Sequence, residues 1–448
     1  MTLTPADLRA LRADFPALDR RRNGKPPVYL NNTCMTLRPR AVIDAVTRYY
    51  TDFPTCGGGR SEGARKLHSW FAEELQAEEA AAREALARLV NAARPDELVW
   101  TRNATEALNI VAHGFPLEPG DRVLLSEREH NSNLVPWLEA ERRLRARAGD
   151  PALEVVGTFD LAPDGAFDLA RALAAIRPGV KVVALGHASN LDGTTIPDAD
   201  LRAVADAVHR VGGVLVLDGA QSVPHRRVDV RVLGIDFLAF SLHKMCGPSG
   251  VGALYGRYDA LERVAPFVVG GDTVRDTWHD RVVYKPPPAR FEAGLQDYAG
   301  ILGAAAAIDY VTRRVGLHPI AAHEANDQPP PANWIRLQGS ARQAEAFAPE
   351  SLAAHGPRLA QYRTLDATTD TRATSYAANR LRHDTAEEPA ARLTAPWATG
   401  PQLFDHIAVT HPALSQASRL YRVNAIALDF ARGPAGHRYR ATYDLVAP

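Results

Sequence analysis

Polar and titratable side chains recur directly after short apolar segments in the first 260 residues of the chain. Five such segments are predicted as strands, at residues 97–101, 122–126, 182–186, 214–217 and 237–240. The polar groups that follow them include His130, Asn190, Asp218 and Lys244. Because ligand sites in open α/β sheets lie beyond the carboxyl ends of the strands, these groups are expected to meet at one edge of a sheet.

Lys244 and Asp218 form the pair with the clearest chemical meaning. Lysine is scarce, since the chain has only five, at positions 25, 66, 181, 244 and 285. A lysine at a sheet edge can form a Schiff base with a carbonyl group, and a buried carboxylate can keep a pyridinium nitrogen protonated. Pyridoxal phosphate (PLP) enzymes need both groups, because the protonated ring is the electron sink for the substrate carbanion.

A phosphate group needs hydrogen-bond donors, and a helix predicted from residue 104 can supply them at its N-terminus. Ala104, Thr105 and Glu106 open this helix, while Ser241 and His243 flank the lysine. Each residue alone also has an ordinary interpretation: a solvated lysine, a turn aspartate, a helix cap or a loop histidine. Polar groups at five strand ends in sheet order favour a common site instead.

The elements that must position these residues alternate between strand and helix. Helices are predicted at 39–52, 65–93, from 104 onward, 135–147 and 198–209, and a short N-terminal helix has Thr4 as its N-cap and Pro5 at its first position. Buried apolar runs that alternate with helices predict an α/β fold of three layers, in which a mostly parallel sheet is covered on both faces.

A proline-rich run at residues 328–331 precedes a tail of different composition. Beyond it the chain has no Lys, Cys or Met, and only residues 404–409 and 423–430 are predicted as elements. The expected organisation is a large PLP-binding domain at residues 41–315 and a smaller α+β domain. An N-terminal segment (1–40) and the divergent C-terminal part (316–448) both contribute to the smaller domain.

The composition excludes several classes of protein. Fifty-two basic and 52 acidic residues balance, which argues against a nucleic-acid partner. No apolar run of about 18 residues predicts a membrane span, and the N-terminus lacks the apolar core of a secretory signal. Three cysteines cannot form a disulfide framework, which favours a reducing compartment and hence the cytoplasm. No pattern of metal ligands is evident.

Longer segments around the strand ends carry a family resemblance. They are residues 29–32, 103–109, 129–137, 187–193, 215–222, 240–244 and 290–294. Together they resemble the class V aminotransferase family of fold-type I PLP enzymes, and within it most closely the cysteine desulfurase and selenocysteine lyase branch. The resemblance covers about residues 29–310.

The resemblance implies a role for each matching residue. Lys244 would be the Schiff-base lysine and the proton shuttle at the substrate α carbon, and Asp218 the partner of the pyridine nitrogen. His130 would stack on the ring and act as a candidate acid or base. The remaining cofactor contacts would be made near the ring hydroxyl by Asn190 and Gln221, and at the phosphate by Thr105, Ser241 and His243. A homodimer is implied, with loops at 270–273, including Thr273, and 291–294 approaching the partner's site.

The sequence departs from the family in three places. Desulfurases of the family carry a nucleophilic cysteine on a C-terminal loop that takes sulfur as a persulfide, but no cysteine follows Cys246. The Arg-x-Gly-x-x-Cys context that clamps the substrate carboxylate is absent, and Arg432 is the nearest candidate, although chance explains it equally well. Leu295 stands where the family often has a threonine that contacts the partner's phosphate.

Further candidate substrate contacts lie in two N-terminal loops. Asn32 and Cys34 belong to a loop that is close to the active site in the family, whereas Cys56 and Arg60 flank three glycines in a predicted flexible loop. Cys246 is expected to pack beneath the cofactor. The ordinary interpretation of all three cysteines is a small buried or loop thiol. The alternative is that Cys34 or Cys56 contacts the sulfur or the substrate.

The expected function is that of a PLP-dependent enzyme acting on an amino-acid substrate through a Lys244 aldimine. Cysteine desulfurase-like or carbon–sulfur lyase chemistry is favoured. Of these two, the missing C-terminal cysteine favours the lyase reaction. The alternatives are a class V-type aminotransferase, an epimerase, a PLP-dependent substitution or cyclisation enzyme of a specialised pathway, or a non-catalytic PLP-binding protein. A nicotinamide enzyme is disfavoured because no Gly-x-Gly-x-x-Gly follows the first strand.

Overall fold

The structure is a computed structural model of the 448-residue chain. It describes residues 4–56, 69–162 and 165–317, with Pro5 described by its backbone alone, and the strand positions alone between residues 334 and 446. The chain divides into two compact units, Met1–Glu324 and Ala325–Pro448. All of the helices and strands that surround the candidate site belong to the first unit.

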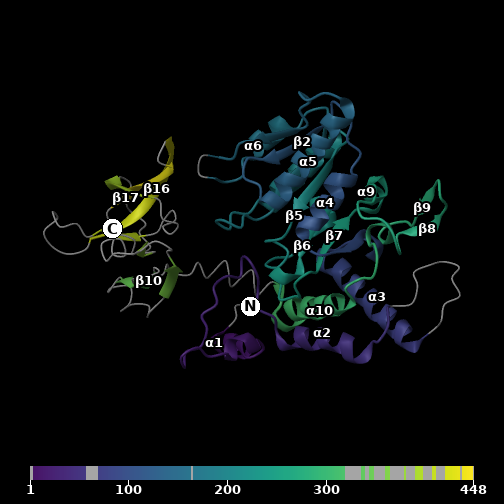
Figure 1. Ribbon diagram of the computed structural model, residues 1–448, viewed down its shortest axis with the longest axis horizontal. Helices are drawn as coiled ribbons and strands as arrows, with labels where there is room; N and C mark the ends of the chain where they lie inside the picture. The colour runs from purple at the N-terminus through teal and green to yellow at the C-terminus, as the bar shows by residue number, and fades with distance from the viewer. Residues whose placement is uncertain are drawn as a thin grey trace. The chain divides into compact units, whose positions relative to one another are not determined.

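A seven-stranded sheet forms the centre of the first unit (Figure 1), and its strands lie in the order β1-β7-β6-β5-β4-β2-β3. Its strands are β1 Leu98–Thr101, β2 Arg122–Ser126, β3 Val156–Phe159, β4 Val180–Gly186, β5 Val214–Asp218, β6 Phe237–Ser241 and β7 Gly252–Gly256. Neighbouring strands from β3 to β6 are parallel, while β7 is antiparallel to both β1 and β6. The predicted mostly parallel sheet is confirmed, and the structure adds β3 and β7 to it.

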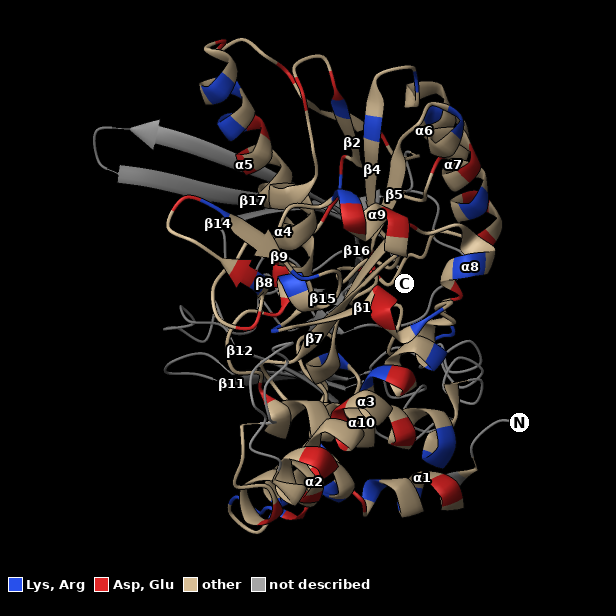
Figure 2. Ribbon diagram, turned by 90° about the vertical axis from the view of Figure 1, so that its right-hand side faces the viewer, with Lys and Arg blue, Asp and Glu red and all other residues tan. Residues whose placement is uncertain are grey.

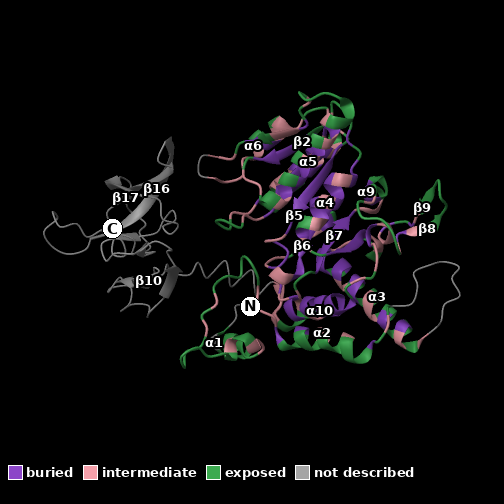
Figure 3. Ribbon diagram, viewed as in Figure 1, coloured by how far each residue is buried: buried purple, intermediate pink, exposed green. Residues whose placement is uncertain are grey.

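Successive residues of each strand contribute to two separate hydrophobic cores. Along β5, Val214 and Val216 belong to one core, and Leu215 and Leu217 to the other. This alternation follows from the period of two residues in a strand. Because helices cover both faces, the strands at the centre of the sheet contain continuous apolar runs, and β5, β6 and β7 are buried along their whole length (Figure 3).

The helices therefore form the outer two of three layers. One core is shared with α4 Ala104–Gly114, α5 Asn131–Ala148 and α9 Tyr258–Arg263. The other is shared with α3 Trp70–Val90, α6 Leu169–Ala175, α7 Asp198–Arg210, α8 Val230–Leu233 and α10 Tyr298–Asp309. The predicted three-layer α/β architecture is confirmed.

Two predicted helices near the N-terminus are also confirmed. The first, α1 (Pro5–Arg12), begins with the predicted Thr4 cap, whose hydroxyl accepts from the Asp7 N–H, while the Asp7 side chain accepts from the Thr4 N–H. The second, α2 (Arg40–Asp52), packs on α10. Acidic and basic residues are interspersed on the outer faces of α1 and α7, in keeping with the balanced charge (Figure 2).

A buried ion pair fixes the loop at residues 291–294. Arg83 of α3 donates to both carboxylate oxygens of Glu292, at 2.8 and 3.0 Å, and the Trp100 N–H of β1 donates to the same carboxylate at 2.8 Å. Both charged side chains are buried, with relative exposures of 8% and 2%. Such a pair is costly to break, because one partner alone would leave a buried charge uncompensated. The loop is thereby held on the edge of the sheet.

The described elements of the second unit are strands. A three-stranded sheet contains β10 Trp334–Gln338, β11 Gln343–Phe347 and β12 Leu359–Arg363. A five-stranded sheet contains β13 Ala378–Asn379, β14 Pro389–Pro396, β15 His406–Val409, β16 Arg419–Gly433 and β17 Gly436–Val446. The predicted elements at 404–409 and 423–430 overlap β15 and β16. A smaller α+β domain shared by residues 1–40 and 316–448 stays a prediction.

In the part of the chain that the structure describes, each helix is too short or too polar to cross a bilayer.

Candidate active site

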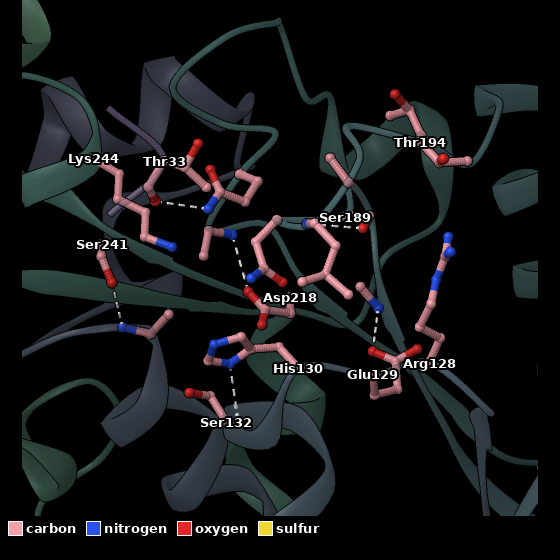
Figure 4. Close-up of a pocket in the computed structure, with 18 of the residues that line it drawn as sticks. Thr33, Arg128, Glu129, His130, Ser132, Ser189, Thr194, Asp218, Ser241 and Lys244 are labelled. Carbon is pink, nitrogen blue, oxygen red and sulfur yellow. Dashed lines mark hydrogen bonds between the residues drawn. The ribbon is translucent and has the colours of Figure 1, made fainter. Parts of the chain in front are cut away.

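A pocket of about 520 Å³ lies at the carboxyl ends of β2, β4, β5 and β6 (Figure 4). Ser126, Gly186, Asp218 and Ser241, which are the last residues of these four strands, all line it. The pocket also brings together most of the residues predicted from the sequence: Cys34, Ala104, Thr105, His130, Asn190, Asp218, Gln221, Ser241, His243 and Lys244. The strand-end rule therefore locates the pocket correctly.

Asp218 presents a buried carboxylate to this pocket. The residue is 7% exposed, and its Oδ1 accepts a hydrogen bond from the Ala220 N–H at 3.0 Å. Among the described residues, no hydrogen bond reaches the other carboxylate oxygen. Burial raises the pKa of the Asp218 carboxyl, whereas the Ala220 hydrogen bond and the charges of Lys244 and His130 act in the opposite direction. A cationic N–H donor from a ligand would satisfy this carboxylate.

Lys244 extends toward Asp218 from the short helix Leu242–Lys244, directly after β6 (Figure 4). Its side chain is half-buried, and burial lowers the pKa of the amine, while the charges of Asp218 and Cys34 raise it. A lowered pKa increases the fraction of neutral amine at a given pH, and the neutral amine is the form that attacks a carbonyl carbon. Lys244 is therefore suited to Schiff-base chemistry.

His130 is the N-cap of α5, and the ring lies beside Asp218 (Figure 4). Its Nδ1 accepts a hydrogen bond from the Ser132 N–H at 3.1 Å. An accepting Nδ1 carries no proton in the neutral ring, so this geometry assigns the proton to Nε2. The cap thus fixes both the orientation and the tautomer of the histidine.

The N-terminus of α4 offers an anion site next to Lys244. The Thr105 N–H has no partner among the described residues, and the Thr105 hydroxyl lies 2.8 Å from the Ser132 hydroxyl. The Ser241 hydroxyl accepts from the Ala104 N–H at 2.8 Å, which leaves its own proton free to donate. His243 lies on the same wall. A phosphate group fits here, because free donors and the positive end of the helix dipole coincide.

Glu129 is a pocket residue to which the sequence analysis assigns no role. Its carboxylate accepts from the Ser126 hydroxyl at 2.6 Å, the Asn133 side chain at 2.9 Å and the Gly186 N–H at 2.7 Å. These contacts fix the end of β4 to the segment that carries His130. Its position next to His130, three residues after the end of a predicted strand, was the available sequence signal.

Several predicted residues lie away from the pocket. Glu106 donates its N–H to the Asn103 cap, and its carboxylate accepts from Arg102. Thr273 is buried and donates its hydroxyl to the Gly270 carbonyl. Two others, Asn32 and Cys56, are exposed and outside the pocket wall. Arg60 and the side chain of Arg432 lie outside the described residues.

Cys246 is also absent from the pocket wall. Its N–H donates to the Thr36 hydroxyl at 2.7 Å, and the residue is half-buried with a φ of 63°. Burial raises the pKa of the thiol to about 11. A thiol that stays protonated at neutral pH is a poor nucleophile, so the structure favours a packing role for Cys246.

The free carboxylate oxygen, the half-buried lysine and the open helix N-terminus together fit PLP. The family model described as "Aminotransferase class-V" matches residues 28–328, which include every residue of the pocket wall. The chain belongs to the class-V aminotransferase family. As a member of this family with a fitting site, it is a PLP-dependent enzyme of fold type I.

Similar proteins of the family carry the name cysteine desulfurase. A probable cysteine desulfurase of Vibrio cholerae is 39% identical over 307 residues, which cover 68% of this chain and 72% of that protein. A cysteine desulfurase of Serratia proteamaculans is 38% identical over 323 residues, which cover 71% of this chain and 74% of that protein.

Solved structures of the family have the same fold as the first unit. A cysteine desulfurase from Thermococcus onnurineus superposes with a TM-score of 0.61 at 31% identity, over 73% of this chain and 75% of that one. A cysteine desulfurase from Escherichia coli gives a TM-score of 0.60 at 32% identity, over 75% and 80%. The family match ends at residue 328, close to the boundary between the two units.

Proposed function

We propose that this enzyme cleaves the carbon–sulfur bond of L-cysteine, by cysteine desulfurase-like or carbon–sulfur lyase chemistry. The observation that carries the proposal is the pocket in which Lys244 faces the buried carboxylate of Asp218, in a chain that is 37–39% identical to proteins named cysteine desulfurase. When bound, PLP supplies an electron sink that stabilises negative charge on the substrate carbon atoms.

The chain's own residues bind and orient the reacting groups. Thr105, Ser241 and His243 would hold the phosphate at the N-terminus of α4, and Asp218 would keep a proton on the ring nitrogen. Lys244 would hold the cofactor through Nζ, and the same amine would move the proton at the substrate α carbon. His130 lines the same pocket, and its Nε2–H would be the proton that it can offer to a substrate. Asn190 and Gln221 complete the wall.

The two sulfur reactions differ in their products. A desulfurase transfers the sulfur to a thiol and releases alanine, whereas a lyase eliminates sulfide and releases pyruvate and ammonia after hydrolysis. No cysteine follows Cys246, so the thiol that usually accepts the sulfur in the family is missing from this part of the sequence. Elimination is therefore favoured if no other thiol accepts the sulfur.

An absorbance screen of the PLP-loaded enzyme against the amino acids tests this function. L-Cysteine is expected to change the cofactor spectrum and to lose its sulfur, with alanine or pyruvate formed in equal amount. A keto acid or the D-isomer of the substrate, with the sulfur still attached, would instead identify an aminotransferase or an epimerase. A spectrum that no amino acid perturbs would identify a non-catalytic PLP-binding protein.

We also propose that two chains form a dimer close to the site. Phe267, Val268 and Leu295 expose 45%, 48% and 68% of their surface and line a second pocket beside α4. An apolar patch of this kind is typical of a protein interface. Leu295 directly follows the loop at residues 291–294, which the Arg83–Glu292 pair holds in place.

Light scattering is expected to give the mass of two chains for the wild-type protein. Leu295→Glu should shift the mass toward one chain, because the dimer would bury an unpaired charge. A wild-type protein that has the mass of a single chain at micromolar concentration would contradict the dimer.

We propose the cytoplasm as the location, since the structure has all three cysteines as free thiols. Fractionation of cells that produce the protein would test this placement.

A further inference from the structure

Cys34 places a thiol in the wall of the active-site pocket. It is exposed, and within the described part of the chain it is the sole cysteine in that wall. Cys56 and Cys246 do not line this wall; Cys56 is exposed, and the Cys246 N–H donates to the Thr36 hydroxyl. Position therefore singles out Cys34 among the three cysteines of the chain.

Hydrogen bonds hold the segment around Cys34 against the loops of the cofactor site. The Gln221 side chain donates to the Thr33 carbonyl at 2.9 Å (Figure 4). Three residues further on, the Thr36 N–H donates to the His243 carbonyl at 2.9 Å. Cys34 lies between these two anchors, so the thiol is kept at the pocket although it belongs to an N-terminal loop.

Two observations indicate that the surroundings of Cys34 form a ligand-binding site. Asp218 is buried, with 7% of its surface exposed, and one of its carboxylate oxygens has no hydrogen-bond partner among the described residues, as expected where a ligand supplies the donor. Cys34 and Lys244 also line the wall of one and the same pocket. The thiol and the lysine therefore face the same space.

We propose that Cys34 is the residue that accepts sulfur from the substrate and carries it as a persulfide. This inference rests on the proposed function, since it requires cleavage of the carbon–sulfur bond of cysteine. In this proposal the N-terminal segment supplies the acceptor thiol, which is missing from the sequence after Cys246.

The transfer balances without a further reactant. The Cys34 thiolate attacks the substrate Sγ and forms the S–S bond, while the Cβ–Sγ bond breaks. The electron pair of that bond passes to the substrate carbon atoms, and Cβ takes up a proton. One thiol and one cysteine thus become one persulfide and one alanine. An external thiol can then remove the sulfur by attacking the outer sulfur atom of the persulfide.

Peptide mass spectrometry after a single turnover tests the proposal. The PLP-loaded enzyme is mixed with isotope-labelled L-cysteine without external thiol, alkylated and digested. We expect labelled sulfur on the Cys34 peptide and one alanine per active site. Cys34→Ser should lose the label and lower kcat for alanine formation at least ~100-fold, well within the range for deleting a nucleophile. Its spectral change with cysteine should persist, which shows that the variant folds and binds.

Cys56→Ser is the matched control, and the Cys34 peptide should remain labelled in it. Alanine or pyruvate formed at the wild-type rate by Cys34→Ser would overturn the role of Cys34 and leave the proposed function intact. Label on Cys56 or Cys246 would overturn it as well. If the wild-type enzyme leaves the sulfur of cysteine in place, the proposed function itself fails and the inference fails with it.

Discussion

Lys244→Ala is expected to abolish turnover, with a fall in kcat of about 10²–10⁴-fold or more. In the proposed function Lys244 would both bind the cofactor and move the proton at the substrate α carbon, and within the described residues no second lysine lines the pocket. Alanine can do neither. The lowered pKa of the wild-type amine, which results first from burial, indicates that the pocket is adapted to a neutral amine at this position.

The variant should still bind PLP through the phosphate and Asp218 contacts, but without the absorbance of a lysine-bound cofactor. Spectra and stopped-flow kinetics of both proteins with cysteine provide the comparison. Lys285→Ala is the matched control, since Lys285 is buried outside the pocket wall, and it should keep the lysine-bound absorbance. Wild-type turnover in Lys244→Ala would refute the assigned role.

Asp218→Asn is expected to lower kcat by about 10²–10³-fold, the usual effect of losing one preorganised electrostatic partner. An amide cannot hold a proton on the ring nitrogen, so the electron sink weakens while the shape of the pocket is kept. Steady-state kinetics with PLP in excess separate this effect from weaker cofactor binding. An Asn variant that turns over at the wild-type rate would contradict the pairing of Asp218 with the ring.

The same substitution should make the protein without cofactor more stable at neutral pH. Burial raises the pKa of the Asp218 carboxyl in the folded state, so the folded state binds the proton more tightly than the unfolded state. The free energy of unfolding then falls as pH rises from the ordinary pKa of aspartate through the raised value. Asparagine removes this penalty. Thermal unfolding with and without PLP should show the variant gaining stability only in the cofactor-free protein.

The positions of most site residues could be predicted because the strands of this sheet are recognisable from the sequence pattern. A strand buried on both faces is a continuous apolar run, and the first polar residue after it marks the carboxyl end of the strand. Asp218 and Ser241 fit this pattern, since each is the final residue of its strand.

The strand β7 could not be predicted in the same way, because glycine at both its ends weakens the strand signal. Gly252 is required there by packing, since a Cβ atom would lie 2.6 Å from the Asn103 Cα. The start of α5 was likewise predicted too late. Pro136 favours a helix start just before it, whereas the helix begins at Asn131 with His130 as an uncommon N-cap.

The separation of Cys34 from Cys56 depends on tertiary contacts alone. Both were predicted in loops near the substrate, and only Cys34 reaches the pocket. The bond from Gln221 to Thr33 that holds it there joins residues 188 positions apart. No local pattern encodes such a contact.

Borohydride reduction of the PLP-loaded protein, followed by peptide mapping, tests most directly the claim that the pocket at the ends of β5 and β6 binds the cofactor through Lys244. Reduction makes the lysine–cofactor bond permanent, and the chain offers only five lysines for it. The cofactor mass is predicted on the peptide that contains Lys244. Its presence on another lysine, or on none, would contradict the claim.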